Sequence, residues 1–226
     1  IYIGDPINTI RIFNEKEVDE IIIIDIDASK RSQAPDFNFI EDLAAECFMP
    51  LTYGGGVKSI EHAKKLFNLG IEKISVQSEF RRRPEFIAEL SERFGKQSII
   101  ASIDVKTNIF GQKNVYYPGK IKISSRQLED VIQNYEQLGA GEILINSVDR
   151  DGTLTGPDLE VIRRCASVSG IPITAIGGIS CMQDIVDAWK AGANGIGAGS
   201  FFVFHGPHRA VLITYPKRAE LEAQFI

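Results

Sequence analysis

The chain has 226 residues, of which 44% are apolar and 24% charged, and its formal net charge is −5. This composition is typical of a globular protein, and the absence of any run of about 18 uncharged apolar residues argues against a membrane partner. The acidic balance, with no basic stripe, argues against a nucleic-acid partner.

Strand-like and helix-like segments alternate along the chain. Segment 20–27, EIIIIDID, is continuously apolar and β-branched, which predicts a buried parallel strand. Ser59 and Gly70 are placed to cap and to end a helix over 59–70. We expect further strands at 50–53, 72–78, 98–105, 142–148, 172–177 and 195–200, a hairpin-like insertion at 108–120, and helices at 35–47, 84–95, 125–139, 157–170 and 181–192.

This alternation has no Pro-rich or Ser-rich linker, so it predicts a single α/β domain over residues 1–226 with a parallel sheet. The start of the chain, IYIGDPINTI, lacks the basic and apolar regions of a signal peptide. The cysteines Cys47, Cys165 and Cys181 have no metal-ligand spacing, and we expect them to be reduced thiols of a cytoplasmic protein. No metal and no cofactor are expected.

The chain contains an internal repeat at an offset of 122 residues. EIIIIDIDAS falls on EILINSVDRD, PLTYGGGVKS on PITAIGGISC, and GIEKISVQS on GANGIGAGS, with 11 of 29 positions identical. Two such halves predict an eight-stranded (β/α)8 TIM barrel with two-fold half-barrel symmetry. The repeat partner of the strand at 98–105 would precede residue 1, so we expect the first barrel strand to be missing from this chain. That leaves two open strand edges.

Glycine pairs follow two repeat-related strands, as Gly55–Gly56 and Gly177–Gly178. In barrels of this kind the chemistry lies at the carboxyl ends of the strands. Bare glycine amides beside a helix start suit a phosphate, although tight strand-to-helix turns alone would also explain one such pair. Gln77, Ser78, Gly199 and Ser200 end neighbouring strands of the same two halves and can complete two phosphate sites.

Aspartates lie near the same end of the expected barrel. Asp104 follows an apolar run and is expected to point into the barrel mouth, as a general acid or base or as a substrate contact. Asp27, Asp149 and Asp158 are more simply explained as caps of loops or helices.

At the opposite end, three strands begin with a charged residue, namely Glu20, Lys73 and Glu142. The residues themselves indicate no more than solvation of the barrel floor.

The segments DEIIIIDIDAS, PLTYGGGVKS, EKISVQS, IIASIDVK, GAGEILINSVDRDGT and ITAIGG together resemble the HisF family, the cyclase subunit of imidazole glycerol phosphate synthase. The resemblance runs from Gly4 to about Phe204. It implies a lyase of histidine biosynthesis that takes ammonia from a glutaminase (HisH-like) partner. The family joins this ammonia to a bis-phosphorylated ribulosyl substrate, and yields imidazole glycerol phosphate and aminoimidazole carboxamide ribotide.

The resemblance also implies roles for residues. Asp104 matches one of two catalytic aspartates, and the other would lie on the first strand, which is expected to be missing. Asp25 and Asp151 match further acids of the active site. Glu20, Lys73 and Glu142 match three of four residues of a charged ammonia gate. The family's phosphate contacts carry over to Gly55, Gly56, Gln77, Ser78, Asp151, Gly152, Gly177, Gly178, Gly199 and Ser200.

The tail, FFVFHGPHRAVLITYPKR, departs from the usual HisF ending. It resembles paralogues of surface-polysaccharide synthesis, which are thought to supply ammonia to a sugar amidotransferase that makes acetamidino sugars. Two further readings therefore stand beside the cyclase: an ammonia conduit of that kind, and a HisA-like sugar isomerase that acts alone.

Overall fold

The computed structural model describes residues 3–31, 33–117 and 127–225. An eight-stranded sheet runs in the order β1-β2-β3-β4-β6-β7-β8, with β5 paired to β4 at the side. All the pairings are parallel except that of β4 with β5. The strands are β1 (Ile21–Ile24), β2 (Leu51–Gly54), β3 (Lys73–Val76), β4 (Ile99–Thr107), β5 (Lys113–Tyr116), β6 (Glu142–Ser147), β7 (Ile173–Ile176) and β8 (Gly195–Gly197).

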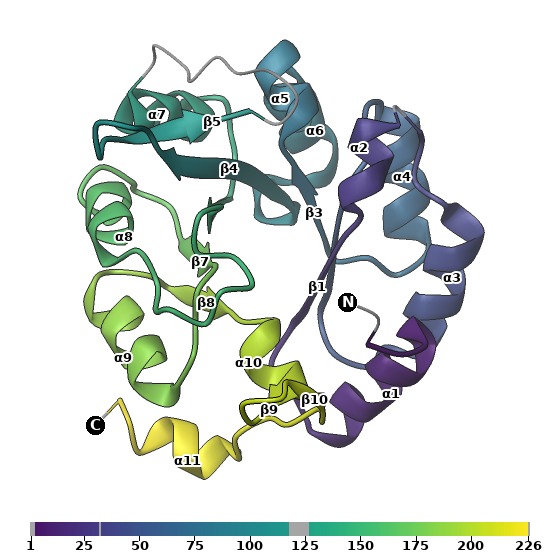
Figure 1. Ribbon diagram of the computed structural model, residues 1–226. Helices are drawn as coiled ribbons and strands as arrows, with labels where there is room; N and C mark the ends of the chain where they lie inside the picture. The colour runs from purple at the N-terminus through teal and green to yellow at the C-terminus, as the bar shows by residue number, and fades with distance from the viewer. Residues whose placement is uncertain (1–2, 32, 118–126, 226) are drawn as a thin grey trace.

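Helices surround this sheet on the outside, as Figure 1 shows. Those that follow strands as the sequence predicts are α3 (Phe37–Ala45), α4 (Ile60–Asn68), α6 (Phe86–Phe94), α7 (Leu128–Gln137), α8 (Leu159–Ala166) and α9 (Met182–Lys190). The alternation of parallel strands and outer helices confirms the (β/α)8 barrel class. Among the described residues no pairing joins β1 to β8, so both of these strands have an open edge.

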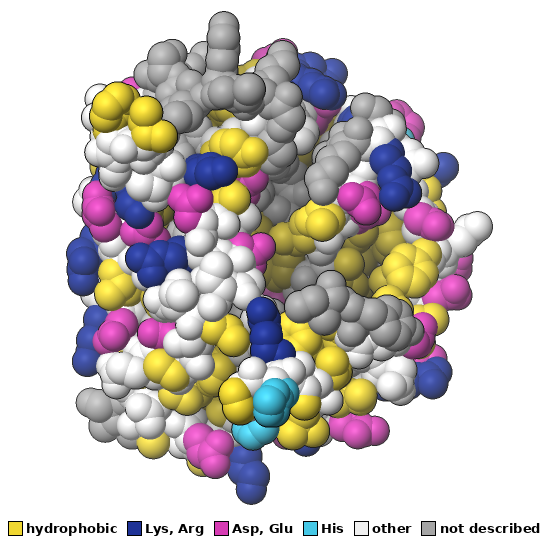
Figure 2. Space-filling view, in the orientation of Figure 1, with side chains coloured by type: hydrophobic (Ala, Val, Ile, Leu, Met, Phe, Trp, Pro, Cys, Tyr) yellow, Lys and Arg dark blue, Asp and Glu magenta, His cyan; other side chains and the backbone are white. Residues whose placement is uncertain are grey.

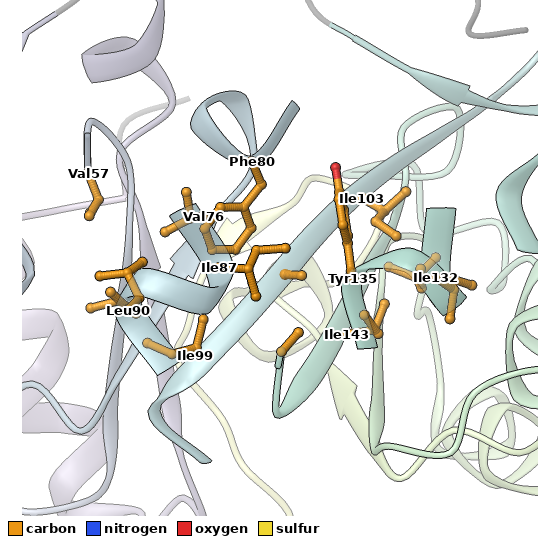
Figure 3. Packing of buried hydrophobic residues seen from close by; sticks show 14 of the residues in the cluster. Val57, Val76, Phe80, Ile87, Leu90, Ile99, Ile103, Ile132, Tyr135 and Ile143 are labelled. Carbon is orange, nitrogen blue, oxygen red and sulfur yellow. The ribbon is translucent and has the colours of Figure 1, made fainter. Parts of the chain in front are cut away.

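The core lies between the strands and the outer helices. Figure 3 shows the part where Ile87 and Leu90 of α6 pack near Ile99 at the start of β4, and where Ile132 of α7 packs near Ile143 of β6. All five side chains are fully buried. Burying each stabilises the fold by roughly 1.5–3 kcal/mol relative to leaving it exposed.

Two predicted helix signals are confirmed at α4. The Ser59 hydroxyl accepts a hydrogen bond from the His62 amide at 3.2 Å, which caps the first turn. Gly70 follows the helix with φ +93°, a conformation that other residues adopt only with strain. Asp158 caps α8 in the same way, with its carboxylate accepting from the Val161 amide.

Three strands end two or three residues earlier than predicted, and a short helix follows each. The strand expected over 195–200 ends at Gly197, and helix α10 (Ser200–Val203) takes up Ser200. The strand expected over 20–27 ends at Ile24, and helix α2 (Ile26–Lys30) follows. The Asp25 carboxylate accepts from the amides of Asp27 and Ala28, which turns the chain out of the sheet. As an edge strand, β1 is also only partly buried rather than buried. The strand expected over 72–78 ends at Val76, and helix α5 (Ser78–Arg82) takes up Ser78.

The structure also contains elements that the sequence did not predict. These are the helix α1 (Pro6–Glu15), the 3-10 turn η1 (Lys96–Ser98), the helix α10 (Ser200–Val203), the two-stranded hairpin β9 (Phe204–His205) and β10 (Ala210–Val211), and the helix α11 (Arg218–Glu222). The expected hairpin after β4 is confirmed in β5. Its last residues, 118–120, and the first two residues of the helix expected over 125–139 lie outside the described residues.

The tail of the chain packs back onto the barrel. Figure 1 shows α10 and the β9–β10 hairpin near the lower part of β1. The Tyr215 hydroxyl donates to the Asp19 carboxylate at 2.8 Å, just before β1. The ring of Phe225 lies 5.1 Å from that of Trp189 on α9. Within the described residues, no helix is both long and apolar enough to cross a bilayer.

Candidate active site

Two adjoining pockets lie at the carboxyl ends of the strands, an end called the mouth here. One, of about 720 Å³, is lined by residues that follow β1, β2 and β3, and by Asp104 of β4 and Asn146 of β6. The other, of about 810 Å³, extends along the open side between β1 and β8 toward the opposite end. Ile24 and Ile176 line both pockets, so the two spaces meet between β1 and β7. The face seen in Figure 2 is hollowed near its centre and carries acidic and basic side chains interspersed.

The first-half glycine turn, Gly55–Gly56, lies in the smaller pocket. Both residues have positive φ, +129° and +68°. A Cβ on Gly55 would lie 2.5 Å from the Asp25 carbonyl oxygen, and one on Gly56 would lie 2.7 Å from the Gln33 carbonyl oxygen. The turn therefore admits glycine alone, and its backbone is bare toward the pocket.

The second-half glycine turn, Gly177–Gly178, has the same geometry. Its φ values are +101° and +94°. A Cβ on Gly177 would lie 2.9 Å from the carbonyl oxygen of Ser147, the repeat partner of Asp25. This turn lines the larger pocket together with other residues that were predicted to bind phosphate, namely Asp151, Gly152, Gly199 and Ser200.

Asp104 lies on β4 and lines the smaller pocket, as predicted. The Asn146 amide nitrogen donates to the Asp104 Oδ1 at 2.9 Å. Burial raises the pKa of Asp104 above its ordinary value, while hydrogen bonds from Gln77 and Asn146 pull it down only in part. A carboxyl group of raised pKa can hold or release a proton nearer neutral pH than a solvated aspartate.

The other aspartates have structural contacts. Asp149 accepts from the Thr107 amide at 2.7 Å. Asp158 caps α8 and forms an ion pair of 2.6 Å with Lys113. Asp25 lines the smaller pocket with Asp104, but its Oδ1 also caps the start of α2, so its carboxylate has a local role at the same time.

The charges at the amino ends of the strands meet in one network. Lys73 Nζ lies 2.9 Å from the Glu142 carboxylate and 3.4 Å from that of Glu20. The hydroxyls of Thr52 and Thr174 donate to Glu20 and Glu142 at 3.0 and 2.6 Å. We call Glu20, Lys73 and Glu142 the floor ion-pair cluster. Burial lowers the pKa of Lys73, but both carboxylates raise it more strongly, and the ammonium form is favoured.

These charges are not merely solvated, since Lys73 pairs with both carboxylates and all three side chains are only partly exposed. The two threonines also follow the repeat, because Thr52 falls on Thr174 as Glu20 falls on Glu142. The sequence analysis did not predict this contact, although the paired identity of a threonine and a glutamate in both halves could have indicated it.

Sequence reasoning missed two further residues at the mouth. Asn146 lies within an apolar strand, where a single amide gives no pattern, yet it contacts Asp104. Its Oδ1 is buried and has no hydrogen-bond partner among the described residues. His62 of α4 gave no functional signal in the sequence either, but its Nδ1 lies 3.3 Å from the Gly56 carbonyl oxygen and its ring packs against Phe37. Among the described residues, no group of three or more His, Cys, Asp or Glu side chains is arranged to hold a metal.

Known proteins are similar to this chain over most of its length. The profile of the family described as "Histidine biosynthesis protein" matches residues 1–208. A Pseudomonas aeruginosa protein, provisionally named imidazole glycerol phosphate synthase subunit hisF2, is 44% identical over 98% of this chain and 88% of its own length. A Leptospira interrogans protein, provisionally named subunit HisF, is 43% identical over 99% of this chain and 89% of its own. The imidazole glycerol phosphate synthase subunit HisF of Alkaliphilus metalliredigens is 35% identical over 89% of this chain and 81% of its own.

Proposed function

We propose, since this chain belongs to the histidine biosynthesis protein family, that it is a HisF-type subunit that takes ammonia at its floor and uses it at its mouth. One observation carries this proposal. A partly buried ion-pair cluster lies at the amino ends of the same strands whose carboxyl ends hold a buried aspartate between two glycine turns. A barrel that serves only one small ligand at its mouth has no need of the first feature.

At the mouth, we assign the two glycine turns to the two phosphates of a bis-phosphorylated ribulosyl substrate. Their bare amides are preorganised for anions, and local dipoles of this kind outweigh a screened net charge of −5. A ligand held at both ends lies across Asp104. In the cyclase reaction a proton must leave the incoming nitrogen, and a carboxylate of raised pKa in that position can accept it. Asp25 lines the same pocket and is assigned a supporting catalytic role.

At the floor, we assign the ion-pair cluster to the control of ammonia entry. A glutaminase subunit bound over this end would release ammonia next to Lys73. The cluster closes the barrel to water while its pairs are intact, because breaking one pair leaves a partly buried charge uncompensated. A docked partner that offers substitute contacts to Glu20 or Glu142 would remove that cost and open the passage.

Lys73→Ala is the test. We expect glutamine-dependent product formation with the glutaminase partner to fall by about tenfold or more, since the passage loses the charge that controls it. Activity with added ammonium salt should stay within about twofold of wild type, because free ammonia also reaches Asp104 from the mouth. Lys64→Ala, at an exposed position of α4, is the matched control. Equal loss with both nitrogen sources would contradict the proposal.

A second candidate is the ammonia conduit for acetamidino-sugar synthesis, with a sugar amidotransferase as a further partner. Two observations favour it. The Pseudomonas aeruginosa relative at 44% identity and a Vibrio vulnificus relative at 42% have the provisional names hisF2 and hisF3. The Alkaliphilus metalliredigens and Streptococcus sanguinis relatives, named HisF without qualification, are 35% and 34% identical. The tail beyond Phe204 also forms its own hairpin and helix. An ammonia-dependent cyclase assay separates the two, because the conduit forms no imidazole product.

A further inference from the structure

The two glycine turns have the same backbone but different surroundings. Gly55–Gly56 and Gly177–Gly178 share positive φ values and the same close approach to the preceding strand. The cations that line the two pockets differ: Arg218 lines the larger one but pairs with Glu222, whereas three cations line the smaller one. Lys58, Arg81 and Arg82 line the smaller pocket, next to the first-half glycine turn.

Two of these cations are uncompensated. Among the described residues, neither Lys58 nor Arg81 forms an ion pair, and the guanidinium of Arg81 instead lies 4.9 Å from the ring centre of Tyr117. Arg82 lies 3.9 Å from Glu79, a distance at the limit of an ion pair, on an exposed side chain. A pocket that keeps two unpaired cations beside bare glycine amides is suited to an anion.

The internal repeat allows the residues around the two glycine turns to be compared position by position. The positions equivalent to Lys58, Arg81 and Arg82 in the second half are Ser180, Val203 and Phe204, all uncharged.

Two arginines lie near the second-half glycine turn, but neither lines the larger pocket. Arg150 donates to the Thr155 carbonyl oxygen at 3.0 Å, and Arg209 donates to the Gly152 carbonyl oxygen at 3.1 Å. The second-half turn therefore offers an anion mainly backbone amides, whereas the first-half turn adds up to three side-chain charges.

We propose that the first-half glycine turn binds a diphosphate group, with one phosphoryl on the glycine amides and Ser78, and the second between Lys58 and Arg81. This goes beyond the proposed function, in which a single phosphate occupies each turn, and rests on it only for the assignment of that turn to phosphate. Arg81 and Arg82 follow Ser78 by three and four residues, so they lie about one helical turn, roughly 5 Å, further along α5. Both side chains line the smaller pocket, and the guanidinium of Arg81 is held there against the ring of Tyr117.

Asp25, Glu79 and Asp104 also line the smaller pocket and repel any anion that binds there, and Glu79 lies 3.9 Å from Arg82. Lys58 and Arg81, which form no ion pair among the described residues, are the cations left to offset that repulsion. The planar guanidinium group of Arg81 can bind two oxygens at once, which the second phosphoryl of a diphosphate offers.

The experiment is a titration of the full chain with inorganic pyrophosphate and, separately, with inorganic phosphate, followed by the amide signals of Gly55–Gly56 and Gly177–Gly178 in NMR. We expect pyrophosphate to bind at the first-half turn about tenfold more tightly than phosphate, since charge-assisted contacts to the second phosphoryl are added. Arg81→Gln should lower pyrophosphate affinity about tenfold and phosphate affinity about threefold or less. The slope of log affinity against log salt for pyrophosphate should become shallower.

Arg83→Gln is the matched control, because this substitution removes the same charge two residues along the chain from Arg81. The Arg83 side chain packs on Phe86 and lies 3.5 Å from Glu89, outside the pocket. Lys58→Gln repeats the test from a different element. Equal affinity for the two anions, an equal loss in Arg81→Gln and Arg83→Gln, or pyrophosphate shifts confined to Gly177–Gly178 would each overturn the proposal. A protein that forms no imidazole product but shows these affinities would refute the cyclase and leave the diphosphate site standing.

Discussion

The ionisation of Asp104 depends on a balance between burial and two amide side chains. Burial disfavours the carboxylate, while Gln77 and Asn146 donate hydrogen bonds to it. The amides orient the carboxylate without removing its capacity for proton transfer. The residue is thus held ready for general acid or base chemistry at the point where a ligand bound by both glycine turns would pass.

Asp104→Asn tests this role most directly. We expect turnover with ammonium salt to fall by about 10²–10⁴, the usual cost of losing a positioned proton carrier. The unfolding midpoint should change little, because asparagine keeps the shape of the side chain and one acceptor for Asn146. Asp149→Asn, which alters a carboxylate bound to the Thr107 amide, serves as the control. Wild-type turnover in Asp104→Asn would mean that Asp104 has no part in the chemistry.

Asn146→Ala tests the balance itself. Removing a donor to the carboxylate should raise the pKa of Asp104 further, which ¹³C NMR of the carboxyl signal can follow. The pKa of Asp104 is higher in the folded protein than in the unfolded chain, so folding favours the protonated carboxyl group. The contribution of Asp104 to the free energy of unfolding is therefore greatest below about pH 3.9 and is lost as the pH rises through the pKa of the folded state. The variant should therefore lose more stability than wild type between about pH 4 and pH 7.

Asn68→Ala, at an exposed position at the end of α4, should show neither change. An unchanged Asp104 titration in Asn146→Ala would show that the 2.9 Å contact does not act on the carboxylate in solution.

Single residues at the site were predictable when a pattern marked them. Asp104 ends an apolar strand, and the glycine turns occur twice at one offset, so both were found from the sequence. Asn146 was not, because its importance lies in one contact across neighbouring strands. Lys58 and Arg81 were also missed, since surface charges have no periodicity that separates a lined pocket from a solvated face.

At the scale of elements, the β4–β5 hairpin is joined to the next strand–helix unit by a nearly buried ion pair. Lys113 on β5 contacts Asp158 at the start of α8 at 2.6 Å, with the two side chains 15% and 9% exposed. Arg164 adds a contact from α8 to the Lys113 carbonyl oxygen and pairs with Glu129 of α7. The hairpin is therefore fixed relative to β6, whose end carries the loop of Asp149 and Asp151.

Lys113→Met should lower the free energy of unfolding by about 3 kcal/mol, because it leaves the Asp158 carboxylate buried without its partner. Urea unfolding measures this. The control is Arg218→Met, which breaks an exposed i,i+4 pair with Glu222 and should leave the free energy of unfolding nearly unchanged, because water and salt screen exposed pairs. If the two variants lose the same stability, the Lys113–Asp158 pair is no more than a surface contact.

Element types were predictable from the sequence, but strand ends were not. Strands β1 and β3 were expected to continue past Ile24 and Val76, since Ile26 and Gln77–Ser78 extend a strand-like pattern. Helices α2 and α5 begin there instead. At β1, the end of the strand is set by capping and by tertiary context, because the Asp25 carboxylate accepts from the next amides and β1 pairs on one side only. The tail elements were missed because they are short and owe their order to contacts such as that of Tyr215 with Asp19.

At the scale of the whole molecule, the repeat explains why one ligand can engage both halves. Each half contributes one glycine turn, and the pockets that contain them meet at Ile24 and Ile176. The repeat was visible in the sequence and predicts this arrangement. The unequal charges around the two turns emerge only when the two halves are compared position by position.

Inorganic phosphate should therefore bind at two places and stabilise the fold through both. At tenfold excess over its dissociation constant, each independent site adds about 1.4 kcal/mol, so two sites add roughly 3 kcal/mol to the free energy of unfolding. Thermal unfolding in phosphate checks this, with sodium chloride of equal ionic strength as the control. Amide shifts at neither glycine turn, or no gain over sodium chloride, would contradict the assignment of the turns.

The strand order of the sheet has a consequence for synthesis on the ribosome. Each parallel strand after β1 pairs with the parallel strand that precedes it in the chain. Each new strand can therefore pair with a strand that has already left the exit tunnel. Because the pairing strands are close in sequence, the entropic cost of closing the loops between them stays small. The nascent chain can grow its sheet in the order of translation, with one exposed edge advancing from β1 toward β8.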